Sequence, residues 1–140
     1  MRIAIITDIH EDYHHLKNVI YKIEKQSCYE IICLGDISGY SIPYYKYHHH
    51  RSAHDCLQLL KDKCSTIIVG NHDLHAAKII PEISPQFEFP KDWYEMDYLQ
   101  RKTFSDNKIW LHEKDDLDPL YTKDDILFLQ QQSQLAVKKT

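Results

Sequence analysis

Ile31-Ile32-Cys33-Leu34, at positions 31 to 34, is the middle one of three short apolar runs that decide the fold. The other two are Ile3-Ala4-Ile5-Ile6 and Ile67-Ile68-Val69. Each run is rich in β-branched residues and does not alternate with polar residues, which is typical of strands buried in a parallel sheet. The three runs therefore predict three buried parallel strands.

Two amphipathic segments separate these runs, at residues 14–26 and 53–63. Apolar residues recur in both at the spacing of a helix with one buried face. The order strand, helix, strand, helix, strand is typical of connected βαβ units. We therefore predict an α/β fold, with a parallel β-sheet and flanking helices.

The pattern is weaker in two other parts of the chain. Residues 40–51 contain a proline, four tyrosines and three consecutive histidines, which favours a long irregular loop near the site, with His48, His49 and His50 in solvent. Beyond Asp73, helices are predicted at residues 93–101, 107–114 and 123–134. Thr122 suits the N-cap of the last one.

The composition is that of one globular domain. The 140 residues include 43% hydrophobic and 27% charged residues, which excludes a disordered chain and fits a single domain over residues 1–140. The formal net charge is −4 and lysines and arginines do not cluster, so no nucleic-acid patch and no binding to an anionic membrane are expected. Bound cations would still allow a phosphorylated substrate.

Signals for export are absent from the sequence. The apolar run at residues 3–6 is too short for a signal peptide or a membrane span. Four cysteines (Cys28, Cys33, Cys56 and Cys64) form no CxxC pair, which indicates reduced thiols. We therefore expect a cytoplasmic protein.

Polar residues follow each of the three predicted strands. These are Asp8-Ile9-His10, Gly35-Asp36 and Gly70-Asn71-His72-Asp73. Ligands bind at the carboxyl edge of an open parallel sheet, so the three groups should meet there. Carboxylates together with imidazoles suit first-row ions such as Mn²⁺, Fe or Zn²⁺, and Asp36 could bridge two such ions.

These three blocks, in this order and each after a predicted strand, resemble the first signature blocks of the calcineurin-like metallophosphoesterase superfamily. The resemblance implies that the sheet is the first half of a four-layer β-sandwich. Gly35-Asp36-Ile37-Ser38-Gly39-Tyr40 is more similar to small bacterial phosphodiesterases and dinucleotide polyphosphatases than to the protein serine/threonine phosphatases, which carry Asp-Arg-Gly there.

The resemblance also implies a role for each site residue. Asp8, His10 and Asp36 would hold one metal ion, and Asp36 would bridge to a second ion that Asn71 helps to bind. His72 would assist the leaving group or the transition-state phosphate, and Asp73 would orient its ring. The implied cofactors are two divalent metal ions, Mn²⁺ first, with Fe, Zn, Ni or Mg as alternatives. The implied reaction is hydrolysis of a phosphomonoester or phosphodiester by metal-activated water.

The sequence departs from the superfamily in its second half. A His-Gly block and a Gly-His-x-His block, which would supply further metal ligands, are both missing. We therefore expect a domain truncated before its C-terminal metal-binding blocks. The chain is then a fragment, a degenerate relative, or a protomer that a homo-oligomer or a second chain completes. His112 and the run at residues 48–50 lack the glycine-rich context of those blocks and are not expected to be ligands.

Three alternatives are open at this point. The chain could be an inactive binding or interaction module that keeps the fold. It could be a receiver-like domain with a phosphorylated aspartate, although the lysine expected after a later strand is missing. Asn71, His72 and Asp73 could simply cap the following helix, although a cap requires neither His72 nor Gly70.

Overall fold

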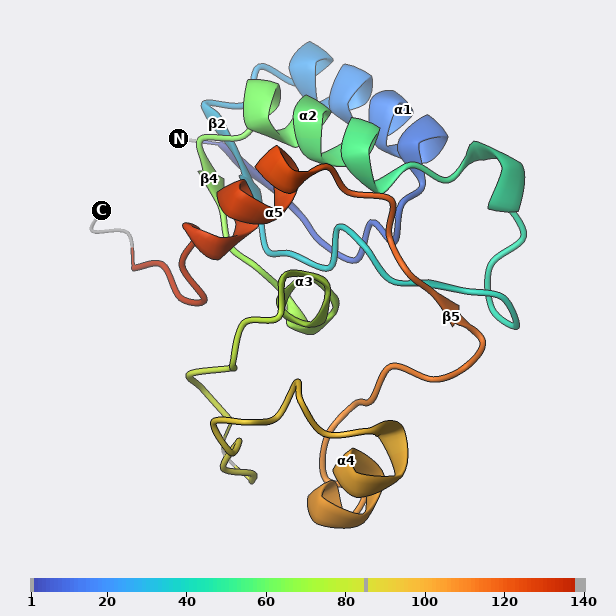
Figure 1. Ribbon diagram of the computed structural model, residues 1–140. Helices are drawn as coiled ribbons and strands as arrows, with labels where there is room; N and C mark the ends of the chain where they lie inside the picture. The colour runs from blue at the N-terminus through green and yellow to red at the C-terminus, as the bar shows by residue number, and fades with distance from the viewer. Residues whose placement is uncertain (1, 85, 138–140) are drawn as a thin grey trace.

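The computed structural model describes residues 2–84 and 86–137. Strands β1 (Ile3–Ile6), β2 (Glu30–Cys33) and β4 (Thr66–Ile67) form a parallel sheet in the order β1-β2-β4 (Figure 1). Ile6 lies opposite Cys33, and Cys33 lies opposite Ile67. The predicted α/β class and its three parallel strands are confirmed, although β4 is only two residues long.

Helices α1 (Tyr13–Lys25) and α2 (Ala53–Lys63) lie side by side over one face of this sheet (Figure 1). Each begins at a residue whose side chain accepts a hydrogen bond from a backbone N–H group in the first turn. Asp12 accepts from His15 at 3.0 Å, and Ser52 accepts from Asp55 at 3.1 Å. Such caps fix where a helix starts, and both helices lie where the sequence predicts them.

The core lies on the helical face of the sheet. Helices α3 (Asn71–Ala77) and α5 (Lys123–Gln130) pack together and add Leu74 and Leu129 to the same apolar cluster that α1 and α2 join. The opposite face of β1 carries Ile3 and Ile5, which are 38% and 62% exposed. The prediction of buried strands is therefore wrong for this face of β1, because these helices all pack on the other side.

The helix predicted at residues 93–101 is displaced along the chain. Helix α4 spans Tyr98–Ser105, because Asp97 and Gln100 form a reciprocal capping pair that starts it there. Trp93 lies before it in a turn, buried against the rings of Phe87 and Phe89.

The other two predicted helices are also corrected. Residues 107–114 form turns and coil, because Asp106 and Asn107 adopt left-handed φ values of 48° and 56° that end α4. Helix α5 begins after the predicted N-cap Thr122 but ends at Gln130 instead of 134. Beyond it the chain turns, and the backbone oxygen of Ser133 accepts a 3.3 Å hydrogen bond from Val69 next to β4.

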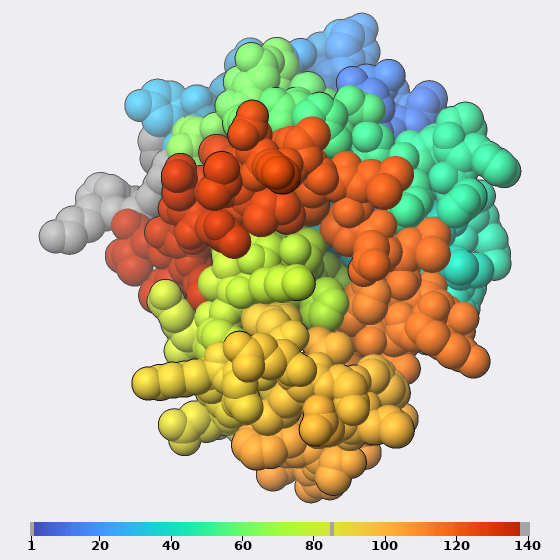
Figure 2. Space-filling model, viewed as in Figure 1, coloured from blue at the N-terminus to red at the C-terminus, as the bar shows by residue number. Residues whose placement is uncertain are grey.

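The loop at residues 40–51 contains two short elements. Strand β3 (Tyr40–Ser41) pairs with β5 (Asp116–Leu117) in antiparallel fashion, and the 3₁₀ turn His48–His50 is exposed, as predicted for its histidines. Figure 2 shows the segment around α4 gathered at the end of the molecule opposite α1 and α2. The four cysteines are free thiols. Among the described residues, each helix is too short or too polar to cross a membrane.

Leu57 on α2 provides a test of this core. Its side chain is completely buried, so Leu57→Ala should lower the free energy of unfolding by about 2–5 kcal/mol through lost burial and the cavity left behind. Urea unfolding followed by circular dichroism would measure the loss. Leu120→Ala is the matched control, because Leu120 is 79% exposed. Equal unfolding midpoints for the two variants would contradict the assignment of the core.

Candidate active site at the carboxyl edge of the sheet

The first two strand-end segments stay paired beyond the sheet. The backbone oxygen of Asp36 accepts hydrogen bonds from the N–H groups of Ile9 and His10, at 2.9 and 3.0 Å. Non-glycine residues with left-handed φ values gather here: Asp8 at 54°, His10 at 47°, Glu11 at 69° and Asp36 at 52°. Such conformations are uncommon and strained for residues with a side chain, and they occur in turns and at functional sites.

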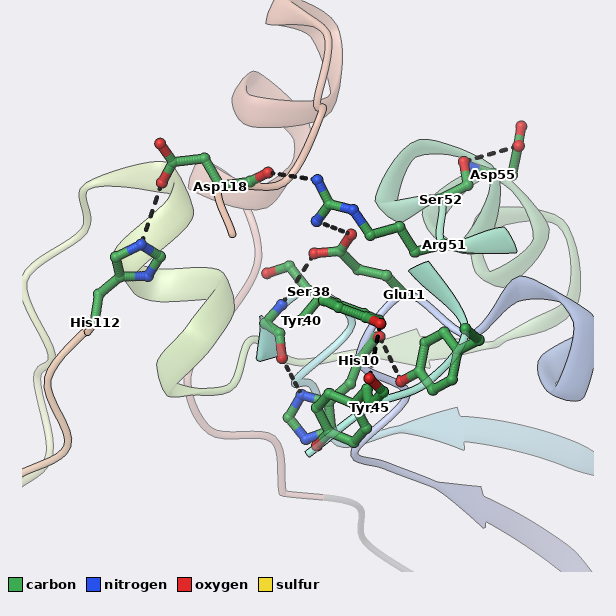
Figure 3. Close-up of polar contacts among 12 residues, drawn as sticks. His10, Glu11, Ser38, Tyr40, Tyr45, Arg51, Ser52, Asp55, His112 and Asp118 are labelled. Atoms are coloured by element: carbon green, nitrogen blue, oxygen red, sulfur yellow. Dashed lines mark hydrogen bonds and ion pairs between the residues drawn. The ribbon is translucent and has the colours of Figure 1, made fainter. Parts of the chain in front are cut away.

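His10 is held from both sides. Its Nδ1 lies 3.0 Å from the carbonyl oxygen of Gly39. Because a carbonyl only accepts hydrogen bonds, Nδ1 carries the proton, and in the neutral ring the lone pair is on Nε2. Nε2 lies 3.7 Å from a carboxylate oxygen of Asp8. The ring of Tyr45 stacks on the imidazole at 5.2 Å, and the Tyr47 hydroxyl donates to the backbone oxygen of His10 (Figure 3).

The second and third strand-end segments meet around two glycines. A Cβ atom on Gly70 would lie 2.2 Å from the Oδ1 atom of Asp36, and one on Gly35 would lie 2.1 Å from the backbone nitrogen of Gly70. Because no side chain fits at either position, glycine allows the two segments to touch. The same Oδ1 of Asp36 accepts a 3.0 Å hydrogen bond from the backbone N–H of His72.

Asp73 is fully buried and acts as a structural acceptor. One carboxylate oxygen accepts from the backbone N–H groups of Ile37 and Ser38 and from the Ser38 hydroxyl, each at 3.0 Å. The other accepts from the N–H of Gly70 at 3.1 Å, which caps α3. Burial raises the pKa of Asp73 to about 6, against the opposing effect of the hydrogen bonds from Ser38 and Gly70.

The role predicted for Asp73 is therefore corrected. Its hydrogen bonds go to the turn at residues 37–38 and to the start of α3, and the Nδ1 atom of His72 is buried without a hydrogen-bond partner among residues 2–84 and 86–137. Asp73 thus does not orient the ring of His72 through this nitrogen. The interpretation as a helix cap, which the sequence disfavoured, describes Asp73 correctly.

His72 lies between His10 and an aromatic residue that sequence reasoning did not assign to the site. Its ring meets the His10 ring edge-on at 5.0 Å and packs against Trp110 at 4.0 Å. Burial lowers the pKa of His72, against the opposing charge of Asp36. This favours a neutral imidazole, which has one N–H donor and one acceptor nitrogen.

Asn71 is the first residue of α3 and its side chain is exposed. Together with Trp110 it lines a largely apolar cavity of about 390 Å³ that also includes Phe89 and Ile83. The Asp8 side chain is 63% exposed. The structure thus brings Asp8 to His10 and joins Asp36 to the start of α3, where Asn71, His72 and Asp73 follow one another.

These residues fit a divalent first-row ion by their chemistry. A histidine whose Nδ1–H donates to a backbone carbonyl, with a free Nε2 next to a carboxylate, is the usual arrangement of a metal ligand, and carboxylate and amide oxygens complete the donor types. Within the described part of the chain, however, no three histidine, cysteine or acidic side chains stand together as a ready metal cluster.

A buried ion pair supports the site and was missed by sequence reasoning. Glu11 is 1% exposed and accepts from Arg51 at 2.9 Å and from the N–H of Gly39 at 3.3 Å. Arg51 also donates to the backbone oxygen of Asp118 (Figure 3). Burial raises the pKa of Glu11, and the charge of Arg51 opposes that rise. The pair joins residues 40 positions apart, so no local pattern indicates it.

His112 lies next to this site but contacts another histidine. Its ring stacks on His75 of α3 at 4.6 Å, with the ring planes 9° apart, and its Nε2 lies 3.4 Å from Asp118. Burial, followed by the charges of His112 and Arg101, lowers the pKa of His75 to about 4.

Comparison with known proteins identifies the relatives of this chain. The sequence model of the calcineurin-like phosphoesterase family matches residues 1–137. The uncharacterized protein MJ0912 of Methanocaldococcus jannaschii is 35% identical over 71 residues, which are 51% of this chain and 26% of that protein. A metallophosphoesterase from Sphaerobacter thermophilus has a similar fold, with a TM-score of 0.53 and 18% identity over 99% of this chain. The chain covers 43% of that structure, so it spans less than half of each relative.

Asp73→Asn tests the buried carboxylate. The amide group would replace one oxygen and place N–H donors against the N–H of Gly70 or of Ile37 and Ser38. At least one buried donor would lose its acceptor, which should lower the free energy of unfolding by about 1–3 kcal/mol. Urea unfolding at neutral pH would measure the change. The control is Asp62→Asn, where a 71% exposed carboxylate loses only a surface pair. Equal midpoints for both variants would refute the structural role of Asp73.

Proposed function

The chain belongs to the calcineurin-like phosphoesterase family, and on that premise we propose that it hydrolyses a phosphomonoester or phosphodiester with two divalent metal ions. Family membership supports the general reaction class, which is hydrolysis of a phosphate ester. The observation that carries the rest is the junction of the three strand-end segments, which brings Asp8 to His10 and Asp36 to the start of α3.

In this proposal each side chain has a defined task. Asp8, His10 and Asp36 would hold one ion, and Asp36 and Asn71 would hold the second. When bound, two such ions lower the pKa of water and offset charge on the phosphoryl oxygens. The carbonyl of Gly39 fixes the tautomer and direction of His10, so that Nε2 presents its lone pair towards Asp8.

His72 is the proposed partner of the leaving group or of the phosphoryl oxygens. Asp36 holds its backbone N–H at 3.0 Å, and Trp110 and His10 restrict its ring. Burial keeps the imidazole neutral, so it can donate a hydrogen bond without adding a charge. Asp73 has no direct part in this scheme; it positions Asp36 and His72 through the backbone.

The mixture of carboxylate, imidazole and amide donors supports Mn²⁺ as the first ion to test. Fe, Zn, Ni and Mg are the alternatives, and oxygen-preferring Mg²⁺ suits His10 least. The free thiols of all four cysteines support a cytoplasmic location.

A second candidate function is that of a binding module without activity. Two observations favour it: the described residues hold no ready cluster of three metal-binding side chains, and β1 exposes Ile3 and Ile5 on its uncovered face. A second copy or another chain that covered this face would then be the partner. The stoichiometry of bound metal separates the two functions.

The test measures metal and activity on the same chain. The protein is stripped with a chelator and incubated with Mn²⁺. Bound metal is then counted by mass spectrometry, and hydrolysis of bis(p-nitrophenyl) phosphate and p-nitrophenyl phosphate is followed. We expect about two ions per chain. Loss of the bridging carboxylate in Asp36→Asn should lower kcat/KM by about 100-fold or more.

Asp124→Asn is the control. This substitution removes the same charge, but Asp124 is exposed at the start of α5, away from the site. It should keep both metal content and rate. Hydrolysis that survives the chelator, or that is equal in Asp36→Asn and Asp124→Asn, would reject the proposed mechanism. One ion or none with no hydrolysis would favour the binding module.

A further inference from the structure

Arg101 on α4 takes part in no ion pair within the described part of the chain. Its Nε atom is buried and has no hydrogen-bond partner there. The ion pairs among residues 2–84 and 86–137 involve other cations, namely His10, His15, Arg51, His54, Lys63 and His112. Buried polar atoms of folded proteins usually have a hydrogen-bond partner, so the unpaired Nε of this half-buried side chain leaves a place for an acceptor.

Arg101 lines a small cavity of about 40 Å³ next to the candidate active site. The described residues around it include neither aspartate nor glutamate. The polar ones are Asn71, His75, Tyr94, Arg101 and His112, and Phe89, Trp93 and Trp110 add aromatic rings. A cavity needs about 10–15 Å³ of such volume to hold one water molecule, so this space fits a group of a few heavy atoms, such as a carboxylate or the outer oxygens of a phosphate. The volume therefore suits one small oxyanion group.

The wall of this cavity favours an anion over other ligands. A guanidinium presents five N–H donors in a planar fork that matches the oxygens of a carboxylate or phosphate. The hydroxyl of Tyr94 already donates to the backbone oxygens of Leu74 and Ile79, so it stays in place as a fixed wall. Burial keeps His75 neutral near pH 7, and Arg101 is the side chain of the cavity with a permanent positive charge.

The cavity adjoins the larger cavity at the start of α3. It shares Asn71, Trp110, Pro81 and Phe89 with the 390 Å³ cavity at the start of α3. Asn71 precedes His72, whose backbone N–H is bound by Asp36. Asn71, a proposed metal ligand, therefore lies in the wall of both cavities, and Arg101 lines the smaller one.

We propose that Arg101 and its cavity bind a second anionic group of the substrate, a carboxylate or a phosphate separate from the phosphate that is hydrolysed. The substrate class is then a phosphate ester that carries a further negative charge. The anion site itself depends on Arg101 and the cavity alone. Its assignment to the substrate rests on the proposed phosphoesterase function.

The test uses the metal-free chain, so that it does not depend on catalysis. Inorganic phosphate and acetate are titrated separately in the presence of a chelator, and binding is measured by calorimetry. We expect one anion per chain, and Arg101→Gln should weaken its binding about tenfold or more, since a charge-assisted hydrogen bond is lost. Binding of phosphate alone would indicate a second phosphate on the substrate, and binding of acetate a carboxylate.

Lys102→Gln is the matched control. It removes the same charge from the same helix, but Lys102 is exposed and its amine contacts the Tyr98 hydroxyl. It should bind the anion as the unchanged chain does. Arg101→Lys keeps the charge but loses the planar fork, so its affinity for the anion should lie between those of the other two variants. Circular dichroism checks that Arg101→Gln is folded.

Two results would overturn the inference. One is that neither anion binds with a stoichiometry of one. The other is that Arg101→Gln and Lys102→Gln bind alike. Chemical modification is a second test: the bound anion should protect Arg101 from phenylglyoxal, as mapped by mass spectrometry. Anion binding without Mn²⁺-dependent hydrolysis would reject the proposed function and keep the anion site, whereas hydrolysis without anion binding would reject only the anion site.

Discussion

The buried carboxylate of Asp73 is the interaction on which the site depends. A carboxylate removed from water must accept hydrogen bonds at its oxygens. The donors are N–H groups of the turn after β2 and of the residue before α3. This requirement fixes the two segments against each other. Asp36 is then close enough to bind the N–H of His72, and the carbonyl of Gly39 faces Nδ1 of His10. The positions of the candidate ligands thus follow from a residue that need not touch the substrate.

The backbone of the strand-end segments is strained, so it needs further interactions to hold it in place. Each non-glycine residue in the left-handed region costs on the order of 1 kcal/mol, and Asp8, His10, Glu11 and Asp36 all adopt it. The backbone bonds to Asp36 and the Glu11–Arg51 pair hold these residues in place. Removing Arg51 would leave Glu11 buried without its counter-ion, so the loop at residues 40–51 is part of the site's architecture.

The sequence predicts the first half of the fold well and the second half poorly, for physical reasons. Strands and helices up to residue 69 bury apolar residues at regular spacing, and Asp12 and Ser52 cap the two helices by local contacts. From residue 80 onwards the structure depends on capping pairs and left-handed turns that apolar spacing does not reveal, so α4 was displaced. Among the site residues, the sequence indicated the strand-end blocks because each follows an apolar run. Trp110 and Arg51 act through contacts with residues distant in sequence, and Arg101 lines a cavity formed by such residues, so none of the three gives such a signal.

The charges of the site divide its tasks between two parts of the chain. Asp8 and Asp36 repel a phosphate until cations neutralise them, so a phosphate at the strand ends would need bound cations. Arg101 needs no metal to attract an anion, because its own charge is unpaired among the described residues. A substrate with two anionic groups would therefore be held first at α4, and its second group would meet the acidic edge only when ions are present. Choice of substrate would then lie in the irregular segment around α4, and the chemistry would lie in the segments that Asp73 joins.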